Sequence, residues 1–199
     1  MHTDVQLRSS DEWKQMQTFL FRPGINFHLN KKLVLSVGYA YISNHQTRND
    51  VSDYVPEHRL WEQLIISHKV KRFAISHRIR LEERFLPTII IQPDELEVAG
   101  FALAGRFRYF LRNILPLNKQ ETFTRGPFAA IQNEIFLNIF GLNKVNNAVF
   151  DQNRFYLACG FRLSPKADLE IGYMNQYVNG RGDLKTTNHI LQFAGYLRL

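Results

Sequence analysis

The chain has 199 residues, a formal net charge of +7, a pI near 9.6 and a mean hydropathy of −0.27. It holds no run of about 18 apolar residues, which excludes a transmembrane helix. Cys159 is the single cysteine, which excludes an internal disulfide and an all-cysteine metal site. No Gly/Ser/Pro-rich linker divides the sequence, so one domain over residues 1–199 is expected. The start lacks a basic and then apolar leader, so either the chain is not exported or its signal peptide is missing from this sequence.

Alternation of polar and apolar residues predicts ten strands in chain order. They cover a weak first strand at 4–8, then 15–29, 33–43, 57–69, 73–86, 98–112, 128–140, 150–163, 167–178, and a last strand after the loop at 179–186. The connections at 44–56, 87–97, 113–126, 141–149 and 179–186 are predicted to be long. The three isoleucines at 89–91 are unusually apolar for such a loop.

The central strand at 73–86 has the clearest alternation. A two-residue period places a row of charge on one face and mainly apolar side chains on the other. The charged face holds Arg78, Arg80, Glu82 and Arg84, and the other face holds His77, Ile79, Leu81, Glu83 and Phe85. Similar charged or polar rows recur in the strands at 98–112 and 128–140.

These patterns predict a single closed antiparallel up-and-down β-barrel of about ten strands, transmembrane and of the outer-membrane type. Outer-membrane barrels have an even number of strands, and their short and long connections alternate. Here the links after strands two, four and eight are predicted to be short, and those after three, five, seven and nine long. The short first hairpin and the long link after strand six depart from this rule. A soluble barrel of the lipocalin type, with the apolar face inside, remains an alternative.

Five fragments resemble a family of Gram-negative bacterial proteins of unknown function, identified as outer-membrane β-barrels. They are residues 56–64 (PEHRLWEQL), 78–85 (RIRLEERF), 106–109 (RFRY), 150–154 (FDQNR) and 170–174 (EIGYM). The resemblance implies the bacterial outer membrane as location and a barrel as fold. It implies no activity, ligand or catalytic residue.

The strongest constellation is a set of ten charged residues expected to line the lumen: Glu57, Arg59, Arg78, Arg80, Glu82, Arg84, Arg106, Arg108, Glu134 and Arg154. The favoured interpretation is a filling of ion pairs in a structural or accessory protein, because a barrel of about eight strands is just filled by side chains. The alternative is that surplus arginine makes a narrow anion-conducting channel.

Tyrosines at strand ends, Tyr39, Tyr41, Tyr109, Tyr173 and Tyr177, are expected to mark the membrane interface. They lie opposite the arginine faces, so nucleic acid is not an expected partner. The expected partners are outer-membrane lipid and a larger outer-membrane protein complex.

A rim enzyme is the least favoured hypothesis, so an enzymatic role is uncertain. His45, Asp50 and Asp53 share one loop prediction and His189 lies near another, but no hydrolase motif accompanies them. His58, His68 and His77 lack the spacing of metal ligands, so neither a metal nor a cofactor is expected.

Overall fold

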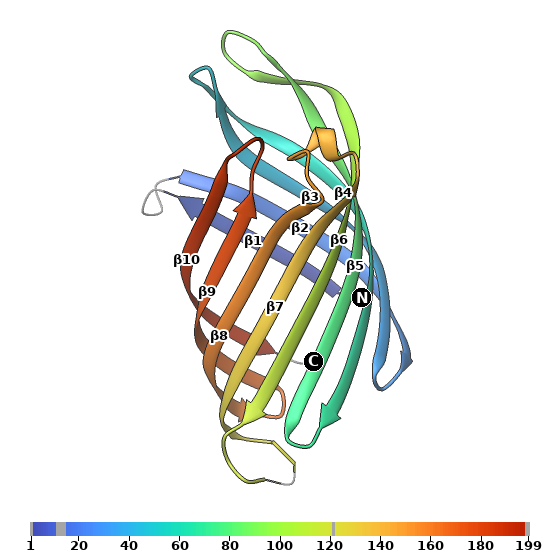
Figure 1. The fold of residues 1–199 in the computed structure, drawn as a ribbon, viewed down its shortest axis with the longest axis vertical. Coiled ribbons are helices and arrows are strands. Elements are labelled where there is room, and N and C mark those ends of the chain that lie inside the picture. Colours follow the sequence, from blue (N-terminus) through green and yellow to red (C-terminus); the bar gives the residue numbers. More distant parts are fainter. Residues whose placement is uncertain (1, 11–14, 121, 198–199) are drawn as a thin grey trace. The chain divides into compact units, whose positions relative to one another are not determined.

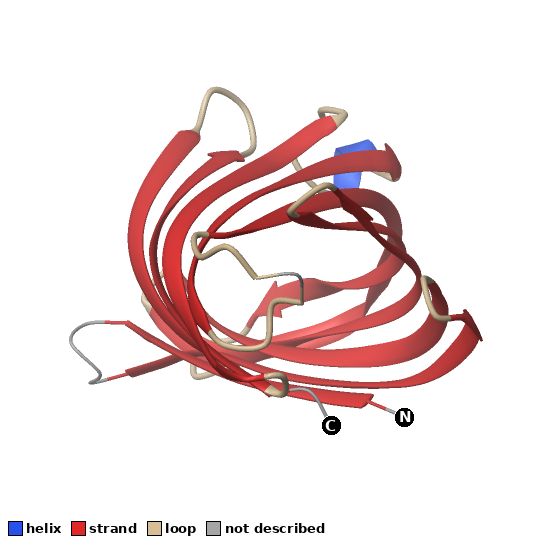
Figure 2. Cartoon of the chain, turned by 90° about the horizontal axis from the view of Figure 1, so that it is seen from below, coloured by secondary structure: helices blue, strands red, loops and turns tan. Residues whose placement is uncertain are grey.

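The computed structural model describes residues 2–10, 15–120 and 122–197. Nearly all of this part of the chain is strand, with a single short helical turn, η1 (Leu142–Lys144), among the described residues (Figure 2). The strands are β1 (His2–Ser10), β2 (Gln15–Asn30), β3 (Leu33–Arg48), β4 (Val51–Val70), β5 (Phe73–Ile91), β6 (Leu96–Pro116), β7 (Gly126–Phe140), β8 (Phe150–Ser164), β9 (Ala167–Asn179) and β10 (Lys185–Leu197). The ten-strand prediction is confirmed within these residues.

The strands form one antiparallel sheet in which each strand pairs with the next along the chain, from β1 to β10. Figure 1 shows β8, β9 and β10 as neighbouring ribbons in this order. This is the up-and-down topology expected from the sequence. Closure of the sheet into a barrel stays a prediction.

The chain divides into two compact units, and each is described separately. Unit 1 contains residues 1–64, 80–107 and 138–149, and unit 2 contains residues 65–79, 108–137 and 150–199. Strands β4 to β7 contribute segments to both. The expectation of one domain stays a prediction.

Two of the loops expected from the sequence are wrong. The segment 44–56 is the tip of a hairpin, because β3 runs to Arg48 and β4 starts at Val51. Asn49 and Asp50 both have positive φ, 48° and 66°, which fits the mirror-image turns of two-residue hairpins. The segment 87–97 is also mostly strand, and its isoleucines end β5. Alternating link lengths therefore do not support a membrane location, since β3–β4 is as short as β2–β3.

Each unit has its own small apolar core. In unit 1, Ala40, Ile42 and Trp61 pack together with Leu20. In unit 2 the core consists of Phe128, Ala130, Tyr156 and Ala158, with Ile114, Phe123 and Met174 packed against it. Both cores are small for their units, and many of the other buried side chains are polar or charged.

Candidate functional site

The charged residues predicted from the sequence separate into two groups. Six of them form the unit 1 charge cluster, which consists of Glu57, Arg59, Arg80, Glu82, Arg84 and Arg106. The other four, in the unit 2 charge cluster, are Arg78, Arg108, Glu134 and Arg154. Six of the ten are buried, namely Glu57, Arg80, Glu82, Arg106, Arg108 and Glu134. These six lie on the polar faces that alternation describes, and the role of all ten residues as a lumen lining stays a prediction.

In the unit 1 charge cluster, two carboxylates receive several guanidinium groups. The Oε1 atom of Glu57 accepts from Nε of Arg59 at 2.6 Å and from Nε of Arg84 at 2.7 Å. The Oε2 atom of Glu82 accepts from Nε and Nη2 of Arg106 at 2.9 and 2.6 Å. Nη1 of Arg80 and Nη1 of Arg59 lie 3.7 and 3.9 Å from Glu82, so this carboxylate faces three arginines.

Arg80 is held by neutral neighbours as well as by charge. Its Nε donates to Oε1 of Gln63 at 3.0 Å, and its guanidinium lies over the Trp61 ring at 5.2 Å. Trp61 in turn donates from Nε1 to the Tyr39 carbonyl at 3.2 Å. Its ring lies across Gly38, where an added Cβ would come within 2.3 Å of it. A glycine on β3 thus makes room for the ring that supports Arg80.

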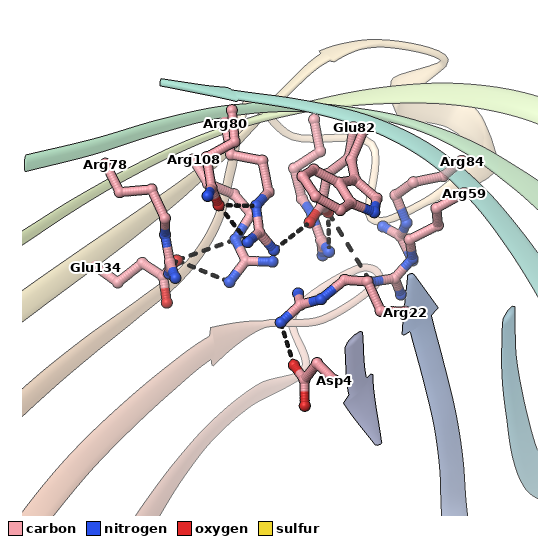
Figure 3. Close-up of polar contacts among 12 residues, drawn as sticks. Asp4, Arg22, Arg59, Arg78, Arg80, Glu82, Arg84, Arg108 and Glu134 are labelled. Carbon is pink, nitrogen blue, oxygen red and sulfur yellow. Dashed lines mark hydrogen bonds and ion pairs between the residues drawn. The ribbon is translucent and has the colours of Figure 1, made fainter. Parts of the chain in front are cut away.

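Glu134 is the centre of the unit 2 charge cluster. Its Oε1 accepts from Nη2 of Arg78 and from Nη2 of Arg108, both at 2.7 Å (Figure 3). Arg154 lies opposite Glu134 in the β7–β8 ladder. The guanidinium groups of Arg108 and Arg154 lie over the ring of buried Phe136, at 4.4 and 5.0 Å. Cation–π contacts of this kind add to the ion pairs when water is excluded.

Two further ion pairs of unit 2 were not in the predicted set. Arg112 donates from Nη2 to Oε2 of Glu170 and from Nη1 to Oε1 of Gln132 at 2.7 Å. Arg162 and Asp168 form a bidentate pair at 2.8 and 3.0 Å. Arg112 lies on β6 and Glu170 on β9, with two strands between them in the sheet. The sheet of unit 2 therefore curls, so that the polar faces of separated strands meet.

The opposite faces of the strands carry exposed apolar residues. In unit 1 these include Leu60, Leu81, Phe101 and Leu103, and in unit 2 they include Ile131, Leu157, Phe161, Leu169 and Ile171, all more than 40 % exposed. Buried charge and exposed aliphatic side chains thus alternate on the same strands, which reverses the usual arrangement of soluble proteins.

Most of the predicted interface tyrosines pair with histidines on the apolar face. Tyr39 in unit 1 is hydrogen-bonded to Nδ1 of His58, whose ring also meets Phe101 edge-on at 5.2 Å, and Tyr41 packs near the same histidine. In unit 2 the Tyr109 hydroxyl lies 2.8 Å from Nδ1 of His77, and His77 stacks on His68. Tyr173 bonds to His189, and Tyr177 packs on Phe150. Their assignment to a membrane interface stays a prediction.

Three of the four residues of the rim-enzyme hypothesis, His45, Asp53 and His189, have structural partners, and Asp50 lies in the β3–β4 turn. In unit 1, His45 packs edge-on against Tyr54 at 5.3 Å, and Oδ2 of Asp53 accepts from the Leu96 amide at 3.3 Å. In unit 2, His189 is bonded to Tyr173, as described above. Within the described residues, no group of three or more His, Cys, Asp or Glu side chains is placed to hold a metal ion. No helix there is long and apolar enough to cross a membrane.

The two charge clusters hold more arginine than carboxylate. The unit 1 charge cluster has four guanidinium groups and two carboxylates, and the unit 2 charge cluster has three and one. Planar guanidinium groups suit bidentate contacts with carboxylates and other oxyanions. Such an arrangement can stiffen a polar face and can attract anions.

Comparison with known proteins gives the family. Residues 1–188 match a family described as Protein of unknown function (DUF2490). The chain belongs to the DUF2490 family. An uncharacterized protein of Methylorubrum extorquens is 28 % identical to this DUF2490 chain over 198 residues, covering 98 % of the chain and 78 % of the relative. No solved structure matches it.

The predicted set of ten residues omits Gln63, Arg112 and Glu170, which also belong to the polar faces of this DUF2490 chain. Alternation places Arg112 on the same face as Arg106 and Arg108, although the predicted set does not include it. The contact between Arg112 and Glu170 carries no local signal, since 58 residues separate the two. Gln63 is neutral, so a search restricted to charged residues passed over it.

Proposed function

We propose that this DUF2490 chain is an integral outer-membrane β-barrel in which the sheet closes between β1 and β10. Its role would be structural or accessory, with an interior filled by the two charge clusters. The proposal rests on one observation above all: on the same strands, the charged side chains are buried and the aliphatic ones are exposed. Contiguous apolar surfaces of more than a few hundred Å² are rare on soluble monomers, whereas lipid covers such a face.

Strand length supports the proposal. A tilted strand of about 9 to 11 residues crosses a bilayer, and β3 to β9 each have 13 or more residues. Exposed carboxylates interrupt this apolar face, among them Glu62 and Glu83. Glu62 precedes Lys71 by nine residues, which is about 30 Å along a strand and about 23 Å across a bilayer at a tilt near 40°. This height is close to that of the apolar band, so Glu62 would lie at its far edge, and Glu83, twelve residues after Lys71, would lie further out.

The soluble alternative predicts the reverse arrangement. A lipocalin-type barrel needs an apolar interior, whereas in unit 1 the buried face holds Glu57, Gln63, Arg80 and Glu82. To expose these charged residues and bury the leucines, the register of every strand would have to shift by one residue.

Fractionation of cells that express the chain with a signal peptide tests the proposal. We expect the protein in the membrane fraction, extraction only with detergent, and a faster-migrating band on gels when the sample is not heated. A monodisperse protein in plain buffer without this shift would contradict the proposal.

The arginine surplus supports a narrow anion-conducting path as a second candidate. Single-channel recording in planar bilayers tests it, with the double variant Arg80→Ala, Arg108→Ala against the unchanged chain. An anion path predicts anion-selective conductance that falls in the double variant. Absent or unchanged conductance leaves the filled, structural barrel.

A further inference from the structure

An exposed apolar groove crosses unit 2 beside a row of cationic links. It is lined by residues from six strands, including Phe73, Leu115, Ala129, Cys159, Ile171 and Leu191. The ladders place Ala129 opposite Cys159 and Cys159 opposite Ile171, so the lining residues form a continuous row. Ala129 and Cys159 are short beside their aliphatic neighbours, which makes the surface concave there.

Besides Arg72, five exposed cations flank this groove at one end of the strands. They belong to or adjoin the β4–β5, β6–β7 and β8–β9 links, and we call them the basic rim: Lys69, Lys71, Lys119, Arg125 and Lys166. The described residues of these three links include no Asp or Glu, while Glu121 of the sequence lies outside the described part. The basic rim therefore carries a local concentration of positive charge.

The backbone beneath the basic rim is fixed by hydrogen bonds. Arg72 donates from Nη2 to the carbonyls of Pro116 and Asn118, each at 2.7 Å, which joins the β4–β5 turn to the β6–β7 link. Arg162 donates to the Phe123 carbonyl at 3.0 Å, and Asn118 donates to the Arg125 carbonyl at 2.9 Å. The lysines of the basic rim take no part in these bonds, and all of them are exposed.

Charge and apolar surface meet directly at this edge. Exposed Val70 precedes Lys71, exposed Leu117 lies two residues before Lys119, and Phe73 of the groove lies two residues after Lys71. Arg125 precedes Ala129 by four residues, about 13 Å along an extended strand. A ligand that matches both features has an anionic head and an aliphatic tail.

We propose that unit 2 binds an anionic phospholipid, with an acyl chain in the groove and the phosphate at the basic rim. This inference rests on the membrane location proposed above. Each Lys or Arg near an anionic lipid surface adds to the attraction, and several together select anionic over zwitterionic headgroups. An acidic protein partner could bind the basic rim, but it would not account for the apolar groove beside it.

The test uses the full chain in detergent, with native mass spectrometry to count retained lipids. Phosphatidylglycerol and phosphatidylcholine are added separately at equal concentration. The rim variant carries Lys71→Gln, Lys119→Gln and Arg125→Gln. The matched control carries Arg48→Gln, Lys144→Gln and Lys185→Gln, which removes the same charge from the opposite ends of strands. Ala129→Phe fills the groove without changing charge.

We expect the unchanged chain to retain phosphatidylglycerol over phosphatidylcholine and inorganic phosphate not to displace it at matched ionic strength. The rim variant should bind phosphatidylglycerol at least about tenfold more weakly, and the control within about twofold of the unchanged chain. Ala129→Phe should also weaken binding. The heat-dependent gel shift verifies that each variant is folded.

Equal retention of both lipids, or full retention by the rim variant, would overturn the lipid site. A second contrary result is an acidic protein that co-purifies with the unchanged chain but not with the rim variant, while the two bind phosphatidylglycerol equally well. In each of these cases membrane insertion stays intact, and only the lipid site is lost. A chain that never enters the membrane fraction would instead overturn the proposed function on which this inference rests.

Discussion

Replacing Glu82 by Gln tests whether the unit 1 charge cluster is a dry, closed network. The Glu82 side chain is 3 % exposed and faces Arg106, Arg80 and Arg59. Removing one member of a buried ion pair costs about 3 to 5 kcal/mol, because the remaining charge stays buried without its counterion. The glutamine keeps the size and one acceptor oxygen, so we expect the lower end of this range, about 3 kcal/mol.

The free energy of unfolding is measured by denaturant titration in lipid vesicles, followed by tryptophan fluorescence. Glu83→Gln is the matched control, since it makes the same chemical change one residue further along, on the exposed face. An exposed substitution of this kind changes stability by about 0.5 kcal/mol or less.

A cost below about 1 kcal/mol for Glu82→Gln would refute the reasoning, because only hydrated, screened ion pairs are worth so little. That result would favour a water-filled interior and hence the anion path over the filled barrel.

Two further predictions concern one unit each. Gly38→Ala should destabilise unit 1 by about 1 to 3 kcal/mol, because its Cβ would lie 2.3 Å from neighbouring atoms, whereas Gly100→Ala meets nothing within 4 Å and should be nearly neutral in the same titration. The double variant Arg78→Gln, Arg108→Gln should lower the free energy of unfolding by about 1 kcal/mol or more beyond the sum of the two single variants. The reason is that both arginines donate to Oε1 of Glu134, so either one alone still neutralises part of its charge. A double-mutant cycle measures this coupling, and additivity within about 0.3 kcal/mol would mean that the two arginines do not share the carboxylate.

The faces of the strands could be predicted from the sequence because alternation is a local property. Each assignment to a face depends only on neighbours two residues away, so Arg80 and Glu82, both buried, could be placed on the same face without knowledge of their partners. The partners could not be predicted in the same way. Arg112 meets Glu170 only because the unit 2 sheet curls, and no short window of sequence encodes that curvature.

Strand ends were predicted less well than faces, for a physical reason. Polar and turn-forming residues at 44–56 indicate a loop, yet hairpin ends that pack against little else tolerate such residues in strands. The segments 44–56 and 87–97 also contain Pro56 and Pro87, yet proline is compatible with extended backbone wherever its missing amide is not required. The isoleucines at 89–91 were the signal that the strand continues.

Polar–apolar alternation agrees with burial where the register between paired strands is uninterrupted. In the β7–β8 ladder the register runs without interruption from Gly126 opposite Arg162 to Phe136 opposite Gln152, and the shift comes only after Phe136. Both the Glu134–Arg154 pair and the Ala129–Cys159 pair lie inside this regular part. A slip of one residue would turn Glu134 outward and Ala129 inward together. The buried charge cluster and the exposed apolar groove of unit 2 are thus two consequences of one register, and a variant that shifts this register should lose both at once.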